Sequence, residues 1–293
     1  MSNVTAITGF AHLHDLPCYL LSFGEAKVVV SSYGAQVLSY QPKPDQELLW
    51  LSPLAVWQQQ QPIRGGVPVC WPWFGSADSK LNPQQQSLPN HGLVRTRHWT
   101  LQQSRVTADY SELCLSVQVK EFPYQAKSTP TNKAEPTKTT ELLLSLRLTA
   151  TSLSINLSCE QSLLQQAALH SYFKVDNLAQ TQVNGIGEHY RDKVLQNRLV
   201  TADPDLRFNK EIDRIYSHAA AELALNSALH QVAITQQGFD STVVWNPGEA
   251  RSATIADLAK DSYQQFVCVE SARLDLSSEA PLCLTQFISL QQS

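Results

Sequence analysis

The chain has 293 residues, of which 43% are hydrophobic and 16% are charged, and its formal net charge is -4. This composition is typical of a folded globular protein, and the slightly acidic balance, with no broad basic field, argues against binding to nucleic acid. No apolar run approaches the length of a membrane span, and the first residues lack the pattern of a secretory signal. The six cysteines lie singly along the chain, so we expect a cytoplasmic protein whose thiols are reduced and mostly buried.

Short runs rich in Val, Leu, Ile, Thr and aromatic residues recur along the chain and indicate β-strands. The clearest runs cover residues 26–42, 112–120, 141–161 and 264–276. Within 153–159 apolar residues alternate with Ser and Asn, a period of two that predicts a strand with one buried face. Helical patterns are limited to two short candidates: 51–60, where Ser52 precedes Pro53 at the first turn, and 203–223.

Many short strands with almost no alternating helices predict an all-β sandwich or barrel with few short helices. Because nothing in the sequence looks like an interdomain linker, we expect one domain over 1–293. The segment 122–141 is rich in Pro, Thr and Lys and lies between two strand runs. It predicts a long, mobile hairpin loop, which we interpret as a tolerated insertion rather than a functional lid.

The stretch "QPIRGGVPVCWPWFG", residues 61–75, places one arginine before two glycines and an apolar run that two prolines interrupt. The glycines predict a sharp turn that lets the backbone approach a ligand closely. Alternation then puts Val67, Val69 and Trp71 on one face of an extended segment, and the prolines indicate an edge or irregular strand. Trp73 or Phe74 is a candidate wall of a cleft, with core packing as the alternative for both.

At four places in the sequence, charged or titratable side chains occur where the packing of a β-strand does not require them. They are Arg64, the cluster of His91, Arg95, Arg97 and His98, the strand-like segment around His170, and Glu270 at the end of an apolar strand. Strand parity places His170 opposite the face that carries Leu169 and Phe173. Both faces of the strand before Glu270 are apolar, which predicts a partly buried carboxylate that must be paired, hydrogen-bonded or used.

At these residues the sequence resembles the aldose 1-epimerase (mutarotase) superfamily, and more closely its hexose-6-phosphate mutarotases. The matching stretches, in family order, are "PIRGGVPVCWPWFG", "LPNHGLVR", "ALHSYFKV", "EIDRIY", "STVVWNPG" and "FVCVESAR". The resemblance implies a galactose-mutarotase-like β-sandwich, or supersandwich, with the sugar in an open cleft on one sheet. It also implies His170 as general acid and Glu270 as general base.

By the same matching, Arg64, Asn90, His91, Arg95 and Asp213 are expected to contact the substrate. Family members usually carry Gln where this chain has Asn90, whose amide sits one methylene closer to the backbone. The implied partner is a small sugar phosphate, most directly D-glucose 6-phosphate, and we expect a monomer that needs neither nucleic acid nor a membrane.

Interconverting the α and β anomers of a sugar needs one base at the C1 hydroxyl and one acid at the ring oxygen. This chemistry requires no metal, cofactor or covalent intermediate, so we expect none. Because the ordinary pKa of histidine makes a charged His170 marginal at neutral pH, we expect an acidic neighbour, Asp213 or Asp240, to keep it protonated. The guanidinium forks of Arg64 and Arg95 match a phosphate group, or alternatively sugar hydroxyls.

Two other function classes stay open at this stage. One is a mutarotase for an unphosphorylated aldose or a different hexose phosphate, and the other is a non-catalytic carbohydrate-binding protein on the same sandwich. An acid–base pair argues against simple binding, because binding alone needs no such pair. A glycoside hydrolase would use two carboxylates, for which Asp213 and Glu270 are the nominal candidates.

Overall fold

Three antiparallel sheets form the framework of the computed structural model, which describes residues 2–58, 61–120, 122, 139–201, 206–218 and 220–291. The first sheet has four strands in the order β1-β2-β3-β4. Its strands are β1 (Asn3–Phe10), β2 (Leu13–Phe23), β3 (Ala26–Ser31) and β4 (Val37–Gln41).

The second sheet has eight strands in the order β12-β16-β17-β20-β9-β8-β7-β6. Its strands are β6 (Thr100–Val106), β7 (Ser111–Val119), β8 (Thr140–Leu148), β9 (Ser152–Leu163), β12 (Gln182–Asn184), β16 (Glu222–Asn226), β17 (Gln231–Gln237) and β20 (Ala280–Leu290). The predicted alternation over 153–159 is confirmed in β9, where the odd-numbered residues are buried.

The third sheet also has eight strands, in the order β14-β13-β15-β18-β19-β10-β5, with β11 pairing to β19 beyond the end of β10. Its strands are β5 (Val69–Cys70), β10 (Ala167–Leu169), β11 (Tyr172–Lys174), β13 (Tyr190–Asp192), β14 (Arg198–Val200), β15 (Ile212–Ser217), β18 (Ser241–Asn246) and β19 (Phe266–Arg273). The break between β10 and β11 falls at residues 170–171.

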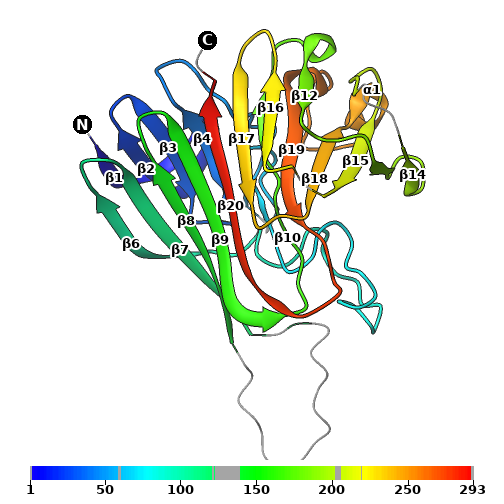
Figure 1. The fold of residues 1–293 in the computed structure, drawn as a ribbon. Coiled ribbons are helices and arrows are strands. Elements are labelled where there is room, and N and C mark those ends of the chain that lie inside the picture. Colours follow the sequence, from blue (N-terminus) through cyan, green and yellow to red (C-terminus); the bar gives the residue numbers. More distant parts are fainter. Residues whose placement is uncertain are drawn as a thin grey trace, which may run out of the picture.

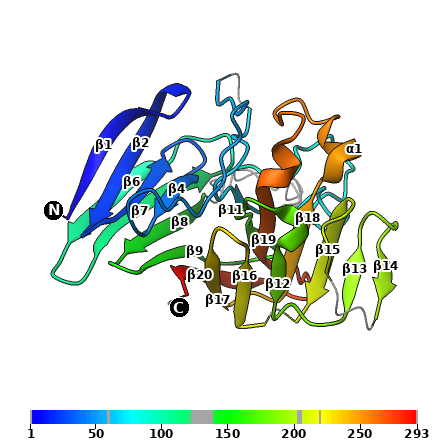
Figure 2. The ribbon, with the colours of Figure 1, turned by 90° about the horizontal axis from the view of Figure 1, so that it is seen from above.

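The second sheet is the common layer of the sandwich, and the other two sheets cover different parts of one face (Figures 1 and 2). Strands β2 and β3 contact β7 and β8, so the four-stranded sheet covers the β6–β9 end. Buried side-chain bonds join β20 to residues beside β11 and in β19, so the third sheet covers the other end. The predicted all-β sandwich is confirmed.

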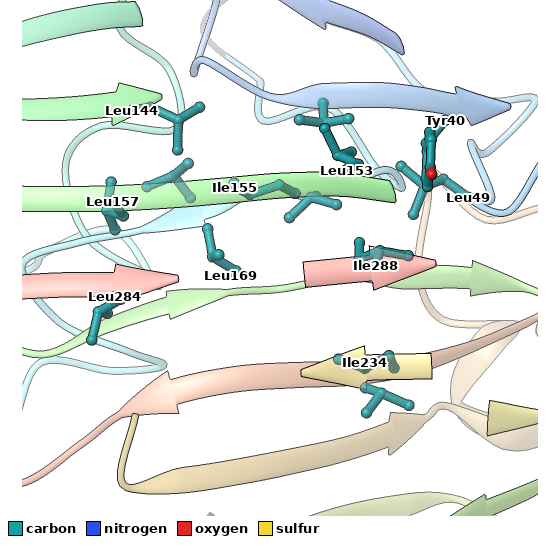
Figure 3. Close-up of a cluster of buried hydrophobic side chains, with 14 of the residues drawn as sticks. Tyr40, Leu49, Leu144, Leu153, Ile155, Leu157, Leu169, Ile234, Leu284 and Ile288 are labelled. Carbon is teal, nitrogen blue, oxygen red and sulfur yellow. The ribbon is translucent and has the colours of Figure 1, made fainter. Parts of the chain in front are cut away.

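One buried apolar cluster fills the space between the layers (Figure 3). Its members come from all three sheets, and those labelled in Figure 3 are Tyr40, Leu49, Leu144, Leu153, Ile155, Leu157, Leu169, Ile234, Leu284 and Ile288. Val67, Val69 and Trp71 belong to the same cluster, which confirms the predicted face of the 61–75 stretch. Strand β5 forms the edge of its sheet, as the neighbouring prolines predicted.

The helices are few and short, as expected, but they do not lie where the sequence placed them. They are α1 (Gly248–Ser252) and the 3₁₀ turns η1 (Leu178–Gln180) and η2 (Ser262–Gln265). The prediction for 51–60 is wrong over its described residues, where the Ser52 hydroxyl accepts a bond from the Leu54 N–H in a turn. In the described part of 203–223, strand β15 and the start of β16 replace the expected helix.

Strands β7 and β8 pair along their whole length, which confirms that the 122–141 segment connects a hairpin. Residues 123–138, on which the expectation of a mobile loop falls, lie outside the described residues. Five of the six cysteines are buried and all are free thiols, as predicted. Among the described residues, no helix is long and apolar enough to cross a membrane.

Candidate active site

A cavity of about 440 Å³ opens on the third sheet, and every substrate-contacting or proton-transferring residue predicted from the sequence lines it. These residues are Arg64, Asn90, His91, Arg95, His170, Asp213 and Glu270. They come from the turn before β5, the loop after it, the break between β10 and β11, and strands β15 and β19. The fold therefore gathers residues that lie up to 206 positions apart in the chain, from 64 to 270.

His170 and Glu270 are in direct contact, with the His170 Nε2 and Glu270 Oε1 atoms 3.3 Å apart. Both side chains are buried, 7% and 1% exposed. The His170 backbone N–H donates to the Pro68 carbonyl, which holds the break between β10 and β11 against the 61–75 stretch. Glu270 Oε2 has no hydrogen-bond partner among the described residues, so the carboxylate retains an acceptor for a ligand in the cavity.

Burial controls the protonation of this pair. It lowers the pKa of His170 well below its usual value, and electrostatic interactions with His91, Arg95 and Arg64 lower it further. Burial also raises the pKa of Glu270, with a further contribution from the Asp213 carboxylate. Burial therefore favours a neutral imidazole beside a protonated carboxyl group.

The expectation that Asp213 or Asp240 keeps His170 charged is wrong. Asp240 accepts bonds from the backbone N–H groups of Leu274 and Asp275, which ties it to the end of β19. The carboxylate that touches His170 is Glu270 itself. Sequence reasoning missed this contact because strand pairing, which joins residues 100 positions apart, decides it.

Arg64 is held from two sides. Its Nε lies 3.0 Å from Asp257 Oδ1 and 3.1 Å from Oδ2, and its Nη1 donates to the Tyr172 hydroxyl at 3.1 Å. The Tyr172 ring in turn stacks on the His170 ring, with centroids 4.9 Å apart and planes 10° apart. Asp257, which the sequence did not suggest, thus fixes the guanidinium of Arg64. Arg64 in turn bonds to Tyr172, whose ring stacks on His170.

His91 and Arg95 complete one wall of the cavity. His91 Nδ1 accepts from the Gly75 N–H, which leaves its Nε2 as the donor, and burial lowers its pKa to about 3, with Arg95 as the next cause. Its ring meets the His170 ring edge-on at 5.4 Å. The Nε of Arg95 is buried with no hydrogen-bond partner among the described residues. Such a donor is costly to leave unpaired, so an anion or hydroxyl in the cavity would satisfy it.

The remaining predicted contacts lie near the rim. Asn90 lines the cavity, and its Oδ1 accepts from the Ser76 hydroxyl. Asp213 lies 3.4 Å from Lys193 Nζ, and burial raises its pKa, against the lowering effect of that lysine. Arg97 and His98, grouped with His91 and Arg95 in the sequence, instead line a separate cavity, because the turn after Val94 carries them to the β6 side of the sheet.

Several lining residues were not predicted. They are Pro62, Pro89, Lys193, Glu211, Val243, Trp245, Arg251 and Ile255. Glu211, Val243 and Trp245 lie inside stretches that carry the family resemblance, so the sequence could have indicated them as site residues. Lys193 and Arg251 lie outside every such stretch and reach the cavity only through the packing of β13 and α1. Of the two aromatic wall candidates, Phe74 lines the cavity and Trp73 is buried in the core, with its Nε1 donating to the Pro89 carbonyl.

A glutamine from the opposite layer supports the site from behind. Gln286 of β20 is fully buried, accepts from the Ser171 hydroxyl at 2.7 Å and donates to the Ser271 hydroxyl at 2.7 Å. Ser171 follows His170 and Ser271 follows Glu270, so one side chain ties both chain segments of the acid–base pair to the common sheet. Gln286 thus adds polar contacts between the layers whose apolar core Figure 3 shows.

The family model of aldose 1-epimerases matches residues 17–280. The chain belongs to the aldose 1-epimerase family. It is 32% identical, over 98% of its length and 95% of the other protein, to an Escherichia coli protein named "putative glucose-6-phosphate 1-epimerase". Its fold matches a Salmonella typhimurium crystal structure described as "a putative mutarotase (YeaD)", with a TM-score of 0.83 and 29% identity over 99% of this chain and 97% of that one.

A galactose 1-epimerase from Lactobacillus acidophilus has the same fold, with a TM-score of 0.72 over 99% of both chains, although only 12% of the residues are identical. At that identity the likeness concerns the fold alone. The galactose-mutarotase-like architecture and the assignment to the isomerases, both expected from the sequence, are confirmed.

Proposed function

We propose that this aldose 1-epimerase interconverts the α and β anomers of a hexose 6-phosphate, with D-glucose 6-phosphate as the substrate that the named relatives suggest. One observation carries the proposal: the buried His170–Glu270 pair borders a cavity that four cationic side chains also line. The pair serves proton transfer at a hemiacetal, and the cations serve a dianionic phosphate. The four cationic side chains are Arg64, Arg95, Lys193 and Arg251.

The proton transfers follow from the pair. Glu270 takes the proton of the C1 hydroxyl while His170 gives a proton to the ring oxygen, so the C1–O5 bond breaks and an open-chain aldehyde forms. Rotation about C1–C2 presents the other carbonyl face, and the reverse transfers close the ring. After opening, the proton is on Glu270 and the imidazole is neutral, which is the state that burial already favours. Burial thus stabilises the charge distribution of the open-chain intermediate.

The substrate phosphate prepares the pair for the forward step. Arg95 and Arg64 are among the charges that lower the pKa of His170. A dianion bound between these guanidinium groups cancels part of that effect and shifts the shared proton from Glu270 to His170. Arg95 is the stronger phosphate candidate, because its Nε lacks a partner while Arg64 is already held by Asp257.

The first test follows the optical rotation of freshly dissolved α-D-glucose 6-phosphate, with the spontaneous rate subtracted. Glu270→Gln and His170→Asn should each slow the enzyme-dependent relaxation by about 10²–10⁴-fold, because each removes one half of the proton transfer. Equal relaxation by wild type and Glu270→Gln would favour a non-catalytic carbohydrate-binding protein.

The phosphate assignment is tested separately. Replacing Arg64 and Arg95 together with Met should raise KM for the phosphorylated sugar far more than for free glucose. Equal losses on both sugars would overturn the assignment and favour a mutarotase for unphosphorylated aldoses.

A further inference from the structure

Beside the proposed acid and base lies a third side chain with metal-binding chemistry. The ligand atoms of His170, Cys268 and Glu270 all lie within 4.8 Å of one another, and all three side chains are buried. Cys268 and Glu270 are two residues apart on β19 and share one face of the strand. His170 reaches them from the break between β10 and β11. Tyr172, the first residue of β11, pairs with Cys268.

We propose that these three residues form an inhibitory site for a thiophilic divalent cation such as Zn²⁺, bound directly at the acid–base pair. The proposal rests on the proposed function only where it concerns inhibition. Binding itself depends on the three side chains alone. Their nitrogen, sulfur and oxygen ligands match the donors that hold zinc in proteins, and the thiolate selects against Mg²⁺ and Ca²⁺.

The distances suit a tetrahedral ion. Ligand atoms about 2.0–2.3 Å from zinc lie about 3.3–3.6 Å apart at tetrahedral angles. The 3.3 Å between His170 Nε2 and Glu270 Oε1 already matches this spacing. The Cys268 Sγ lies within 4.8 Å of both atoms, and a shift of the sulfur toward the pair would bring it to the same spacing. Three protein ligands leave the fourth position open toward the cavity, where a water or a sugar oxygen would complete the shell.

The electrostatics of the pocket allow the ion despite the nearby cations. Arg64, Arg95, Lys193 and Arg251 repel a dication, but the Glu270 carboxylate and the Cys268 thiolate together match its charge. The Asp213 carboxylate, which also lines the cavity, adds attraction. Glu270 Oε2 has no partner among the described residues and is free to take part in the coordination. The thiol gives up its proton when the metal binds, as in other thiolate sites.

Occupation of the site blocks the reaction for a simple chemical reason. The metal takes the Nε2 lone pair of His170 and an oxygen of Glu270, which are the atoms that must carry the moving protons. Such an ion therefore inhibits mutarotation without altering the fold, and a chelator that removes it restores activity.

The test uses Co²⁺ alone as a spectroscopic probe, with no sugar present. All proteins carry Cys283→Ser, which removes the exposed thiol. The parent should bind one Co²⁺ per chain and show a thiolate-to-cobalt charge-transfer band with the visible bands of four-coordinate cobalt. Cys268→Ser should lose the charge-transfer band. Cys70→Ser, which alters another buried thiol of the same sheet outside the triad, should keep it.

Absence of the band in the parent, or its survival in Cys268→Ser, would overturn the metal site. Absence of the band in the parent decides against the site even where a variant fails to fold. Zn²⁺ should then displace the cobalt and stop mutarotation, and the concentration for half-inhibition should rise about 10-fold or more in Cys268→Ser. A protein that binds cobalt as expected yet does not relax glucose 6-phosphate would refute the proposed function and leave the metal site standing.

Discussion

At the scale of single residues, the site depends on side chains that are held by other side chains. Arg64 illustrates this, because its Nε donates to Asp257 and its Nη1 donates to Tyr172. These two bonds fix the orientation of the guanidinium group. Asp257 and Arg64 are 193 positions apart in the chain. A lone aspartate in a polar segment carries no signal for such a role, which is why sequence reasoning did not identify it.

We expect Asp257→Ala to lower kcat/KM for glucose 6-phosphate by about 10-fold, or about 1.4 kcal/mol of transition-state stabilisation. The loss comes from a guanidinium that no longer points into the cavity, so free glucose should be affected less. The measurement is a comparison of initial relaxation rates on the two sugars. Asp261→Ala is the control, because it removes a charge from the same segment, where Asp261 makes no side-chain cap bond. Equal effects of the two substitutions would contradict the positioning role.

At the scale of elements, the turn at Gly65 and Gly66 places both Arg64 and the chain segment that carries His170. The Gly66 N–H donates to the Trp50 carbonyl, and the Gly66 carbonyl accepts from the Tyr172 N–H at 2.8 Å. Gly66 has φ +62°, and a Cβ on it would lie 2.1 Å from the Val37 carbonyl oxygen. Glycine is therefore required by close backbone approach as well as by conformation.

Gly66→Ala should lower the free energy of unfolding by about 2–4 kcal/mol, because the β3–β4 backbone cannot yield to the new methyl group without breaking its pairing. Gly24→Ala is the matched control, with φ +60° but no atom within 4 Å of the added Cβ. Strain alone should then cost about 1–2 kcal/mol. Urea unfolding of the three proteins distinguishes the two contributions, and equal midpoints would show that the close approach is unimportant.

At the scale of the whole molecule, the acid–base pair is aligned by contacts between the layers. Gln286, on the common sheet, bonds to Ser171 and Ser271 and so reaches the two chain segments that carry His170 and Glu270. The apolar core between the layers excludes water, which makes these two bonds costly to lose. The core draws on all three sheets, although the prediction of a single domain over 1–293 stays a prediction.

Gln286→Leu should lower the free energy of unfolding by about 2–5 kcal/mol, because it leaves two buried hydroxyl groups unpaired. It should also reduce kcat when activity is measured at temperatures where the variant is still folded. Gln236→Leu provides the control. Gln236 of β17 is also buried, 5% exposed, and its amide donates to the Ala220 carbonyl and the Thr242 hydroxyl, neither of which belongs to the chain segments that carry His170 and Glu270. It should match the loss in thermal stability with kcat nearly unchanged. If both variants lose kcat in parallel, Gln286 has only a structural role.

The sequence by itself determined the class of fold, the family and the seven residues that meet in the cavity. Period-two alternation is a local property of the chain, as in β9, and short motifs keep His170, Glu270 and Arg64 in recognisable surroundings. The tertiary structure alone decided which groups touch. It brought Glu270 to His170, added Lys193 and Arg251 to the wall, and removed Asp240 from it.

The physical reason is the range of the interactions concerned. Alternation and turn chemistry depend on neighbours within a few residues, whereas a pKa depends on burial and on every charge in the surrounding space. The low pKa of His170 follows from a core and from cations supplied by distant segments. No local pattern in the chain encodes that sum, so the protonation of the pair is a property of the folded molecule.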